Sequence, residues 1–313
     1  MKHLTALMVA LFALVLVRPT VAQDKTSLEI GGGHIEIELG GAPTPEFCKL
    51  VLDWIDTAAR AVAGYYERFP VKQVQLRIDF FEGQGVRGGH TTGRNGPRIR
   101  IAVGNANTAA DFADDWVMTH EFIHLAFPSV ADEHHWIEEG LATYVEPVAR
   151  ARIGELTPVK VWSDWVRDMP KGLPRNGDRG LDFTPTWGRT YWGGALFCLL
   201  ADVEIRERTQ NKRGLEVALR AILNAGGTIE SEWPLTKALR IGDEATGVPV
   251  LGELYEKMKA TPAPVDLSAL WQRLGVERKE NGIEFNDYTP LAPIRQSITK
   301  RADHSQFSIV RPL

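Results

Sequence analysis

The chain has 313 residues, of which 44% are hydrophobic and 24% are charged, and its formal net charge is -4. This is an ordinary globular composition with room for one large domain or two small ones. The balance is slightly acidic and no run is rich in lysine or arginine, which argues against nucleic acid or an anionic membrane surface as a partner.

The first residues indicate a targeting segment rather than part of the fold. Lys2 is followed by an apolar run over residues 4–17 and then by small residues at 20–22. This layout is typical of a secretory signal peptide cleaved after Ala22. The run is short for a spanning helix, which needs about 20 residues, although a retained N-terminal anchor is the alternative. We therefore expect residues 1–22 to be removed and the protein to be periplasmic or secreted, with no stable membrane insertion afterwards.

Export permits disulfides, and the chain has two cysteines, Cys48 and Cys198. Both lie in apolar, helix-like surroundings, and neither is spaced like a metal ligand or a redox pair. Two buried thiols are the favoured interpretation, and a single long-range bridge is the alternative.

The first part of the chain mixes strand and helix patterns. Alternation in HIEIEL predicts a strand, with a Gly31-Gly32-Gly33 turn before it. Thr44-Pro45-Glu46 supplies the capping hydroxyl, the proline and the acid that start a helix. The expected order is strand, helix, strand, glycine-rich loop, strand and helix, over residues 28–39, 44–68, 73–81, 83–96, 98–103 and 108–128.

The second part is mostly helical. A helix is expected over residues 136–153, and residues 157–188, rich in Pro, Gly, Asp and Trp, indicate an irregular connection that could line a cleft. Further helices are expected over residues 193–209, 213–225, 232–241, 248–260 and 267–274. The predicted fold class is α+β: an α+β half over residues 23–155, a helical half over 156–275, and a C-terminal tail over 276–313 with weak strand character.

The stretch THEFIHLAF carries the strongest chemical signal. Residues four apart share a helix face, so His120 and His124 can reach one metal ion. Glu121 lies about 100° round the helix, where it can take a proton from a metal-bound water. This HExxH spacing marks zinc metalloproteases. The plainer alternative is a buried helix with two hydrogen-bonded histidines.

A third protein ligand is needed, with a fourth position left open. A histidine six residues after His124 would extend the motif, but that residue is Val130. The other known arrangement places a glutamate on a following helix, and the segment WIEEGLATY offers one.

WIEEGLATY resembles the WLNEGFASYF-type segment of the gluzincin metallopeptidases, the superfamily of aminopeptidase N and the glycyl aminopeptidases. The resemblance implies that Glu139, which precedes Gly140, is the third zinc ligand. It also implies a zincin-like catalytic domain, in which a small twisted sheet and the active-site helix are followed by a mostly helical subdomain.

A second segment, GRTYWGGAL, is similar to the Tyr-x-Lys-Gly motif of these families. Tyr191 matches the tyrosine and Gly194 the glycine, while Gly193 replaces the lysine. The resemblance implies that the Tyr191 hydroxyl stabilises the oxyanion that forms when water attacks the carbonyl. The alternative is a core tyrosine that opens an amphipathic helix.

One family feature is absent. Relatives of aminopeptidase N carry a Gly-x-Met-Glu-Asn segment whose glutamate holds the substrate's free amine, but residues 88–93 here are GGHTTG. An endopeptidase, or a peptidase with another amine anchor, is therefore at least as well supported as an aminopeptidase. The strand over residues 98–103 is expected at the sheet edge, where an extended peptide would pair.

Three other histidines lie near the expected cleft. His90 is expected to be a solvated loop residue, with contact to substrate as the alternative. His134 and His135 are expected to have no special role, with help to the ligands as the alternative.

The predicted function is a zinc-dependent peptidase with one Zn²⁺ per chain and a peptide or protein substrate. Two alternatives stay open. The same site could hydrolyse a non-peptide amide or ester, because the chemistry is identical. A non-catalytic binding module is the other, although intact Glu121 and Tyr191 argue against it. Oligomeric state and cleavage preference have no signal in the sequence.

Overall fold

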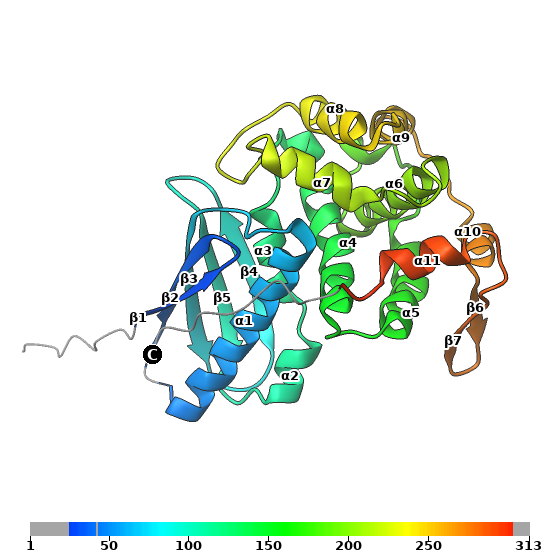
Figure 1. Cartoon of the computed structure of the whole chain (residues 1–313). Coiled ribbons are helices and arrows are strands. Elements are labelled where there is room, and N and C mark those ends of the chain that lie inside the picture. The colour runs from blue at the N-terminus through cyan, green and yellow to red at the C-terminus, as the bar shows by residue number, and fades with distance from the viewer. Residues whose placement is uncertain (1–24, 42, 303–313) are drawn as a thin grey trace, which may run out of the picture.

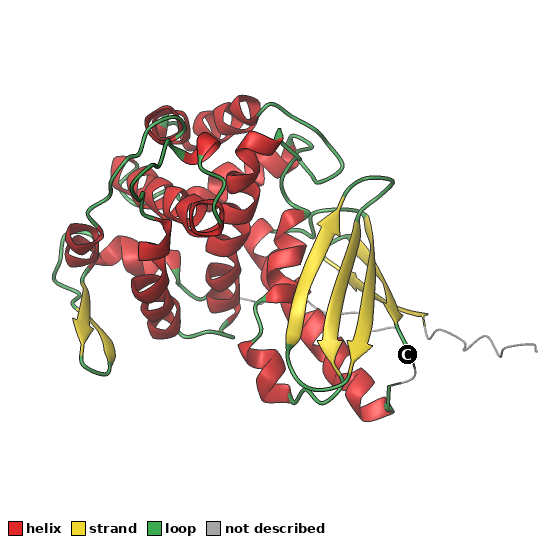
Figure 2. Ribbon diagram, turned by 180° about the vertical axis from the view of Figure 1, so that it is seen from behind, coloured by secondary structure: helices red, strands yellow, loops and turns green. Residues whose placement is uncertain are grey.

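The computed structural model describes residues 25–41 and 43–302, so the predicted signal peptide over residues 1–22 lies outside the described residues. A five-stranded sheet is followed by a largely helical part (Figure 1). Among the described residues, the helices cover one face of the sheet and leave the other bare (Figure 2). The strands are β1 (Lys25–Ile30), β2 (Gly33–Leu39), β3 (Gln73–Phe81), β4 (Val86–Thr92) and β5 (Arg98–Gly104), in the order β1-β2-β3-β5-β4.

The one-sided packing follows from the alternation in the strands. Ile35, Ile37 and Leu39 of β2 are buried, and the residues between them are partly exposed. β2 pairs in parallel with β3, a pairing that needs a crossover, and helix α1 (Pro45–Tyr66) supplies it across the buried face. Thr44 caps α1 by accepting a hydrogen bond from the Phe47 amide at 3.3 Å, as the capping pattern predicts.

Two strand predictions are wrong in detail. The strand expected over residues 28–39 is the hairpin of β1 and β2. The predicted glycine turn is confirmed, because Gly31 and Gly32 take positive φ angles of 52° and 80° and reverse the chain. The central part of the expected glycine-rich loop over residues 83–96 is strand β4. It pairs antiparallel with β5 and forms one edge of the sheet, opposite β1, so β5 is an inner strand and not the expected edge.

The helix expected over residues 108–128 is two helices, α2 (Ala109–Asp114) and α3 (Val117–His124). The break lies at Asp115, whose backbone is extended and whose carboxylate accepts a hydrogen bond from the Val117 amide at 2.9 Å. A short polar side chain that bonds to the backbone in this way competes with a continuous helix. The new helix start fixes the direction of α3.

The helical part begins with α4 (His135–Ile153), which confirms the helix predicted over residues 136–153. The connection expected over residues 157–188 contains α5 (Pro158–Asp168), started by Thr157 and Pro158, and Trp162 and Trp165 of α5 are fully buried. The remaining elements are η4 (Gly188–Gly193), α6 (Gly194–Arg208), α7 (Leu215–Asn224), α8 (Leu235–Thr246), α9 (Val250–Met258), α10 (Leu267–Leu274), β6 (Val276–Lys279), β7 (Gly282–Phe285) and α11 (Ala292–Ile298).

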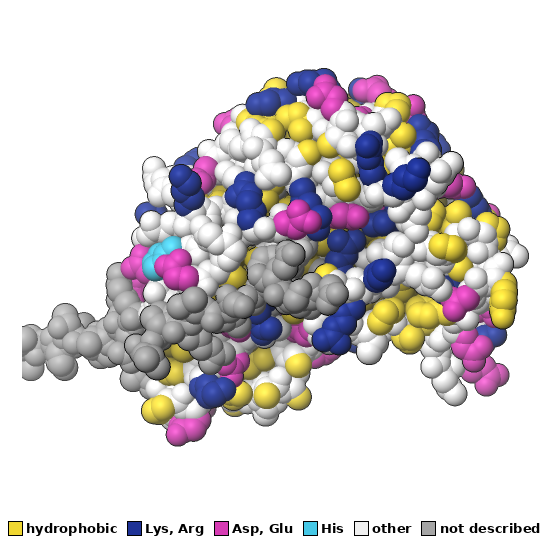
Figure 3. Space-filling view, in the orientation of Figure 1, with side chains coloured by type: hydrophobic (Ala, Val, Ile, Leu, Met, Phe, Trp, Pro, Cys, Tyr) yellow, Lys and Arg dark blue, Asp and Glu magenta, His cyan; other side chains and the backbone are white. Residues whose placement is uncertain are grey.

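The surface and the cysteines agree with a globular chain. Side chains of both charges are interspersed on the face shown in Figure 3. Within the described residues, no helix has both the length and the apolar character that crossing a bilayer requires. Cys198 is buried, Cys48 is half-buried, and the structure holds both as thiols rather than as a disulfide.

Candidate metal centre

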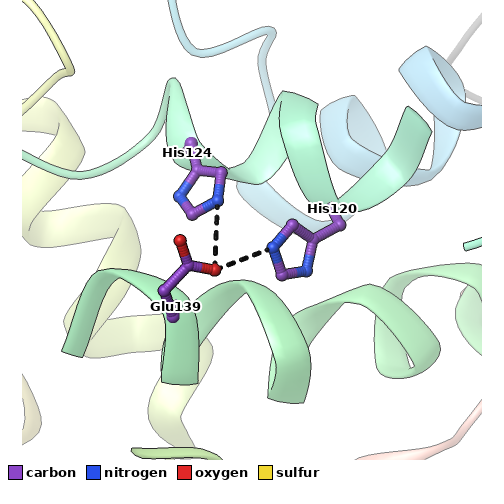
Figure 4. A group of neighbouring side chains, drawn as sticks. All are labelled: His120, His124 and Glu139. Carbon is purple, nitrogen blue, oxygen red and sulfur yellow. Dashed lines mark hydrogen bonds and ion pairs between the residues drawn. The ribbon is translucent and has the colours of Figure 1, made fainter. Parts of the chain in front are cut away.

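Helices α3 and α4 bring the three predicted ligands together. His120 and His124 lie one turn apart on α3, and Glu139 faces them from the first turns of α4 (Figure 4). The Nε2 atoms of His120 and His124 lie 3.1 and 3.7 Å from Oε2 of Glu139. One donor atom from each residue falls within 4.8 Å of the others, so a single ion can reach all three.

This donor set fits zinc. Two imidazole nitrogens and one carboxylate oxygen leave a fourth tetrahedral position open, as in catalytic zinc sites. Burial, with help from His120, lowers the pKa of His124 to about 3, so its ring is neutral and has a lone pair to give. Burial alone would raise the pKa of Glu139, but hydrogen bonds from His120 and His135 outweigh it and hold that pKa below the ordinary range. The carboxylate is therefore ionised.

His135 lies beside this group. Its position supports the alternative interpretation, help to the ligands, rather than the favoured one, in which it has no special role. Its Nε2 lies 3.3 Å from Oε1 of Glu139, and its Nδ1 lies 3.0 Å from Oε2 of Glu138. The Glu139 oxygen that faces away from the two ligand histidines thus has a partner of its own. His134 instead bonds through Nδ1 to Asp182 at 3.0 Å, away from the ligands.

Glu121 lies on the side of α3 that faces the edge strand β4. It is only 6% exposed, yet it lines the same cleft as His120, His124 and Glu139. Burial raises the pKa of its carboxyl above the ordinary value, and a hydrogen bond from Thr91 opposes this effect. The carboxylate is therefore close to the ligand group without belonging to it.

Tyr191 reaches the cleft from η4, a turn of π-helix that leads directly into α6. Its ring lies 6.3 Å from the His120 ring, at an interplanar angle of 17°. Burial raises the pKa of Tyr191 to about 12, and the Glu139 and Glu121 carboxylates add to the shift. Single π-turns inside helices are frequent at functional sites, because the extra residue redirects a side chain.

Two glycines explain how the junction of η4 and α6 comes so close to α4. A Cβ on Gly140 would lie 2.3 Å from the backbone Cα of Gly194, and a Cβ on Gly194 would lie 2.1 Å from the Trp136 carbonyl oxygen. Gly140, directly after Glu139, therefore touches Gly194, which lies three residues after Tyr191. The two motifs found separately in the sequence meet at this crossing, which places Tyr191 opposite Glu139.

The cleft has a volume of about 700 Å³. Besides the five predicted residues, its walls include β4 and the loop between α7 and α8. That loop is fixed against the end of α3, because the Ile229 amide donates to the Leu125 carbonyl and the Ser129 amide donates to the Ser231 carbonyl. The lining residues to which sequence reasoning assigned no role in the site are Gly88, Gly89, Thr91, Thr92, Gly93, Arg94, Trp116, Ser129, Glu138, Ile229, Glu230, Ser231 and Glu232. The loop over residues 229–232 has no local motif that could have signalled this position.

Other residues near the cleft have structural partners. Arg189 forms a buried ion pair with Asp178, Nε to Oδ2 at 2.8 Å, which supports η4 from behind. His90 lines the cleft from β4, so it is not the loop histidine that the sequence favoured.

No protein-family model and no curated protein matches this sequence. Among solved structures, an aminopeptidase N family protein from Idiomarina loihiensis is similar over 82% of this chain, with a TM-score of 0.60 and 14% identity. An M1 zinc metallopeptidase from Deinococcus radiodurans is similar over 78% of this chain, with a TM-score of 0.48 and 15% identity. The chain spans 49% and 54% of the lengths of these proteins. The predicted zincin-like α+β fold is confirmed: the chain shares its fold with part of an aminopeptidase N family protein.

Proposed function

We propose that this protein is an exported zinc-dependent metallopeptidase. The observation that carries the proposal is the convergence of His120, His124 and Glu139 in one cleft that Glu121 and Tyr191 also line or approach. A structural ion pair would need neither a neighbouring buried carboxylate nor a phenol aimed at the same space. The export half of the proposal rests on residues 1–22 of the sequence.

Each of the five side chains has a place in peptide hydrolysis. His120, His124 and Glu139 would hold the ion, which when bound lowers the pKa of a water molecule and polarises the substrate carbonyl. Glu121 accepts the proton from the attacking water and later delivers it to the leaving amine. The Tyr191 hydroxyl, which keeps its proton at neutral pH, donates a hydrogen bond to the oxyanion.

The substrate would bind along β4. This strand is the edge of the sheet that borders the cleft, so its outward backbone amides and carbonyls face the space where an extended peptide would lie. An added strand gains main-chain hydrogen bonds with little dependence on sequence. The predicted docking edge therefore moves from β5 to β4.

The proposal is tested first by metal content. Wild-type protein should hold one zinc per chain by elemental analysis, and Glu139→Ala should lose most of it because one of three ligands is gone. Glu138→Ala is the matched control, since Glu138 contacts His135 and not the ligand histidines. Zinc-free wild type after loading and dialysis would contradict the proposal.

Substrate cleavage is the second test. A peptide library with free and with acetylated N-termini should be cleaved by the zinc-loaded chain. Cleavage of both forms would identify an endopeptidase, and cleavage of free N-termini alone an aminopeptidase with an amine anchor outside β4. If only esters or non-peptide amides were hydrolysed, the peptidase assignment would be wrong although the metal site would stand.

A further inference from the structure

The edge strand β4 touches Glu121 through two residues on one of its faces. Gly89 and Thr91 are two apart, so their side-chain positions point to the same side of the strand. The Thr91 hydroxyl lies within hydrogen-bond distance of Oε2 of Glu121, and 3.1 Å from the Glu121 backbone carbonyl oxygen. A hydroxyl has one proton to donate, and an ionised carboxylate is the stronger acceptor.

Gly89 provides the space in which the carboxylate lies. A Cβ built on Gly89 would lie 2.5 Å from Cγ of Glu121 and 2.7 Å from both Cδ and Oε1. Any side chain at this position would push the carboxylate out of its place. The backbone gives no other reason for a glycine, because Gly89 is absent from the positive-φ residues whereas its neighbour Gly88 has a φ of 92°.

The two oxygens of the Glu121 carboxylate have different surroundings. Oε2 accepts the Thr91 proton, whereas Oε1 lies against Gly89, and among the described residues no other side chain or backbone group bonds to the carboxylate. A glutamate side chain has three rotatable bonds and would otherwise sample several positions. Thr91 and Gly89 together select one of them and leave Oε1 open to a proton donor in the cleft.

We infer that Thr91 is a positioning residue for the proton acceptor: its hydroxyl, with the cradle at Gly89, fixes the orientation of the Glu121 carboxylate. The inference rests on the proposed function, in which Glu121 accepts the proton. Strand β4 would then have two roles, because it would bind the substrate and would also orient the Glu121 carboxylate.

The test removes the hydroxyl and keeps the shape. Thr91→Val should lower kcat by about ten- to a hundredfold, the range expected for a lost hydrogen bond to a charged group. Zinc content should stay close to that of wild type, because Thr91 is not a ligand. KM should change little, because the lost bond is to Glu121 and not to the substrate. Thr91→Ser, which keeps the hydroxyl, should recover most of the rate.

A double-mutant cycle separates positioning from general packing. In a Glu121→Gln background, Thr91→Val should cause little further loss, because the group that Thr91 orients is already gone. Gly89→Ala should lower kcat with zinc retained, since its new methyl group displaces the carboxylate. Thr91→Ala also lacks the hydroxyl and serves if the valine variant does not fold.

Several results would overturn the inference. Wild-type kcat in the hydroxyl-free variants would do so, and so would an equal loss in Thr91→Ser and Thr91→Val, because then the hydroxyl has no role. Full additivity with Glu121→Gln would show that Thr91 acts elsewhere. A zinc-loaded wild type that cleaves no peptide is a separate result, because it removes the proposed function before any Thr91 variant is made.

Discussion

The two walls of the cleft are built differently. The helical wall, made by α3, α4 and η4, supplies side chains that are buried or half-buried, with His120 at 3% and Glu139 at 8% exposure. The opposite wall is β4, where every residue is at least partly exposed and two of the seven are glycine. The helical wall contributes packed functional side chains, and the strand wall contributes mainly exposed backbone.

This difference fits the two demands on a peptidase. The metal ligands and the oxyanion donor need fixed geometry, which buried helix crossings such as Gly140 against Gly194 provide. Peptide binding at a sheet edge needs backbone amides and carbonyls that are accessible for main-chain hydrogen bonds. Glu121 is where the walls meet, since α3 carries it and β4 holds it. Variants on each wall should therefore fail in different ways.

The largest loss with retained metal is expected for Glu121→Gln. The amide cannot accept a proton, so kcat should fall by about a hundred- to ten-thousandfold, the usual contribution of general base catalysis. Zinc measured by elemental analysis should stay at the wild-type level, because Glu121 is not among the grouped ligands. A loss of zinc in this variant would mean that Glu121 is itself a ligand.

Among variants on the helical wall, Tyr191→Phe is expected to cause the second largest loss of kcat. Removal of one oxyanion donor costs about a hundred- to a thousandfold in kcat in known cases, and the phenylalanine keeps the ring contact with His120. KM should change much less than kcat. A rate within threefold of wild type, set here as the limit of about 0.6 kcal/mol, would leave Tyr191 a packing residue.

The pH profile tests the same residue independently. Burial raises the pKa of Tyr191 to about 12, so the hydroxyl keeps its proton at all pH values below that. Any alkaline fall in kcat below about pH 10 should therefore belong to another group and should persist in Tyr191→Phe. An alkaline limb that disappears in the variant would place the tyrosine pKa much lower than its burial implies.

The two walls also differ in how far the sequence predicts them. His120, Glu121 and His124 follow from a spacing within one helical turn, which local periodicity determines, and α3 and α4 have the expected type. Glu139 and Tyr191 came from resemblance, and the structure adds the reason for their proximity, which is the contact between Gly140 and Gly194.

β4 was missed because its signal is not local. Its sequence VRGGHTT has adjacent glycines and no apolar alternation, a pattern that indicates a loop rather than a strand. The strand forms because β5 offers a free edge, and a bulge between Val86 and Gly89 absorbs the irregular register. The break at Asp115 was missed for a related reason, since one side-chain hydrogen bond decided between one helix and two.

The close contact between Gly140 and Gly194 predicts a smaller effect, on stability rather than on catalysis. Gly194→Ala should lower the free energy of unfolding by about 1–3 kcal/mol, as overpacking does, because its Cβ meets the backbone of α4 at 2.1 Å. Gly193→Ala is the matched control. Its Cβ would come no nearer than 3.0 Å to any of its neighbours, the closest being side-chain atoms of Leu181 and Arg189, so the overlap is much smaller. Thermal or urea unfolding measures both, and equal destabilisation would mean that the crossing is not tight.

The smallest effect is expected for His90→Ala on the strand wall. His90 lines the cleft, but the helical wall supplies the proposed chemistry and β4 contributes mainly its backbone. Truncation of the imidazole leaves that backbone in place, so kcat should change by about twofold or less, in line with surface substitutions of about 0.5 kcal/mol. The comparison with Thr91→Val is then direct, because the two residues are adjacent on one strand and face opposite sides. If His90→Ala lowered kcat as much as Thr91→Val, β4 would contribute side chains generally, and the difference between the two walls would not hold.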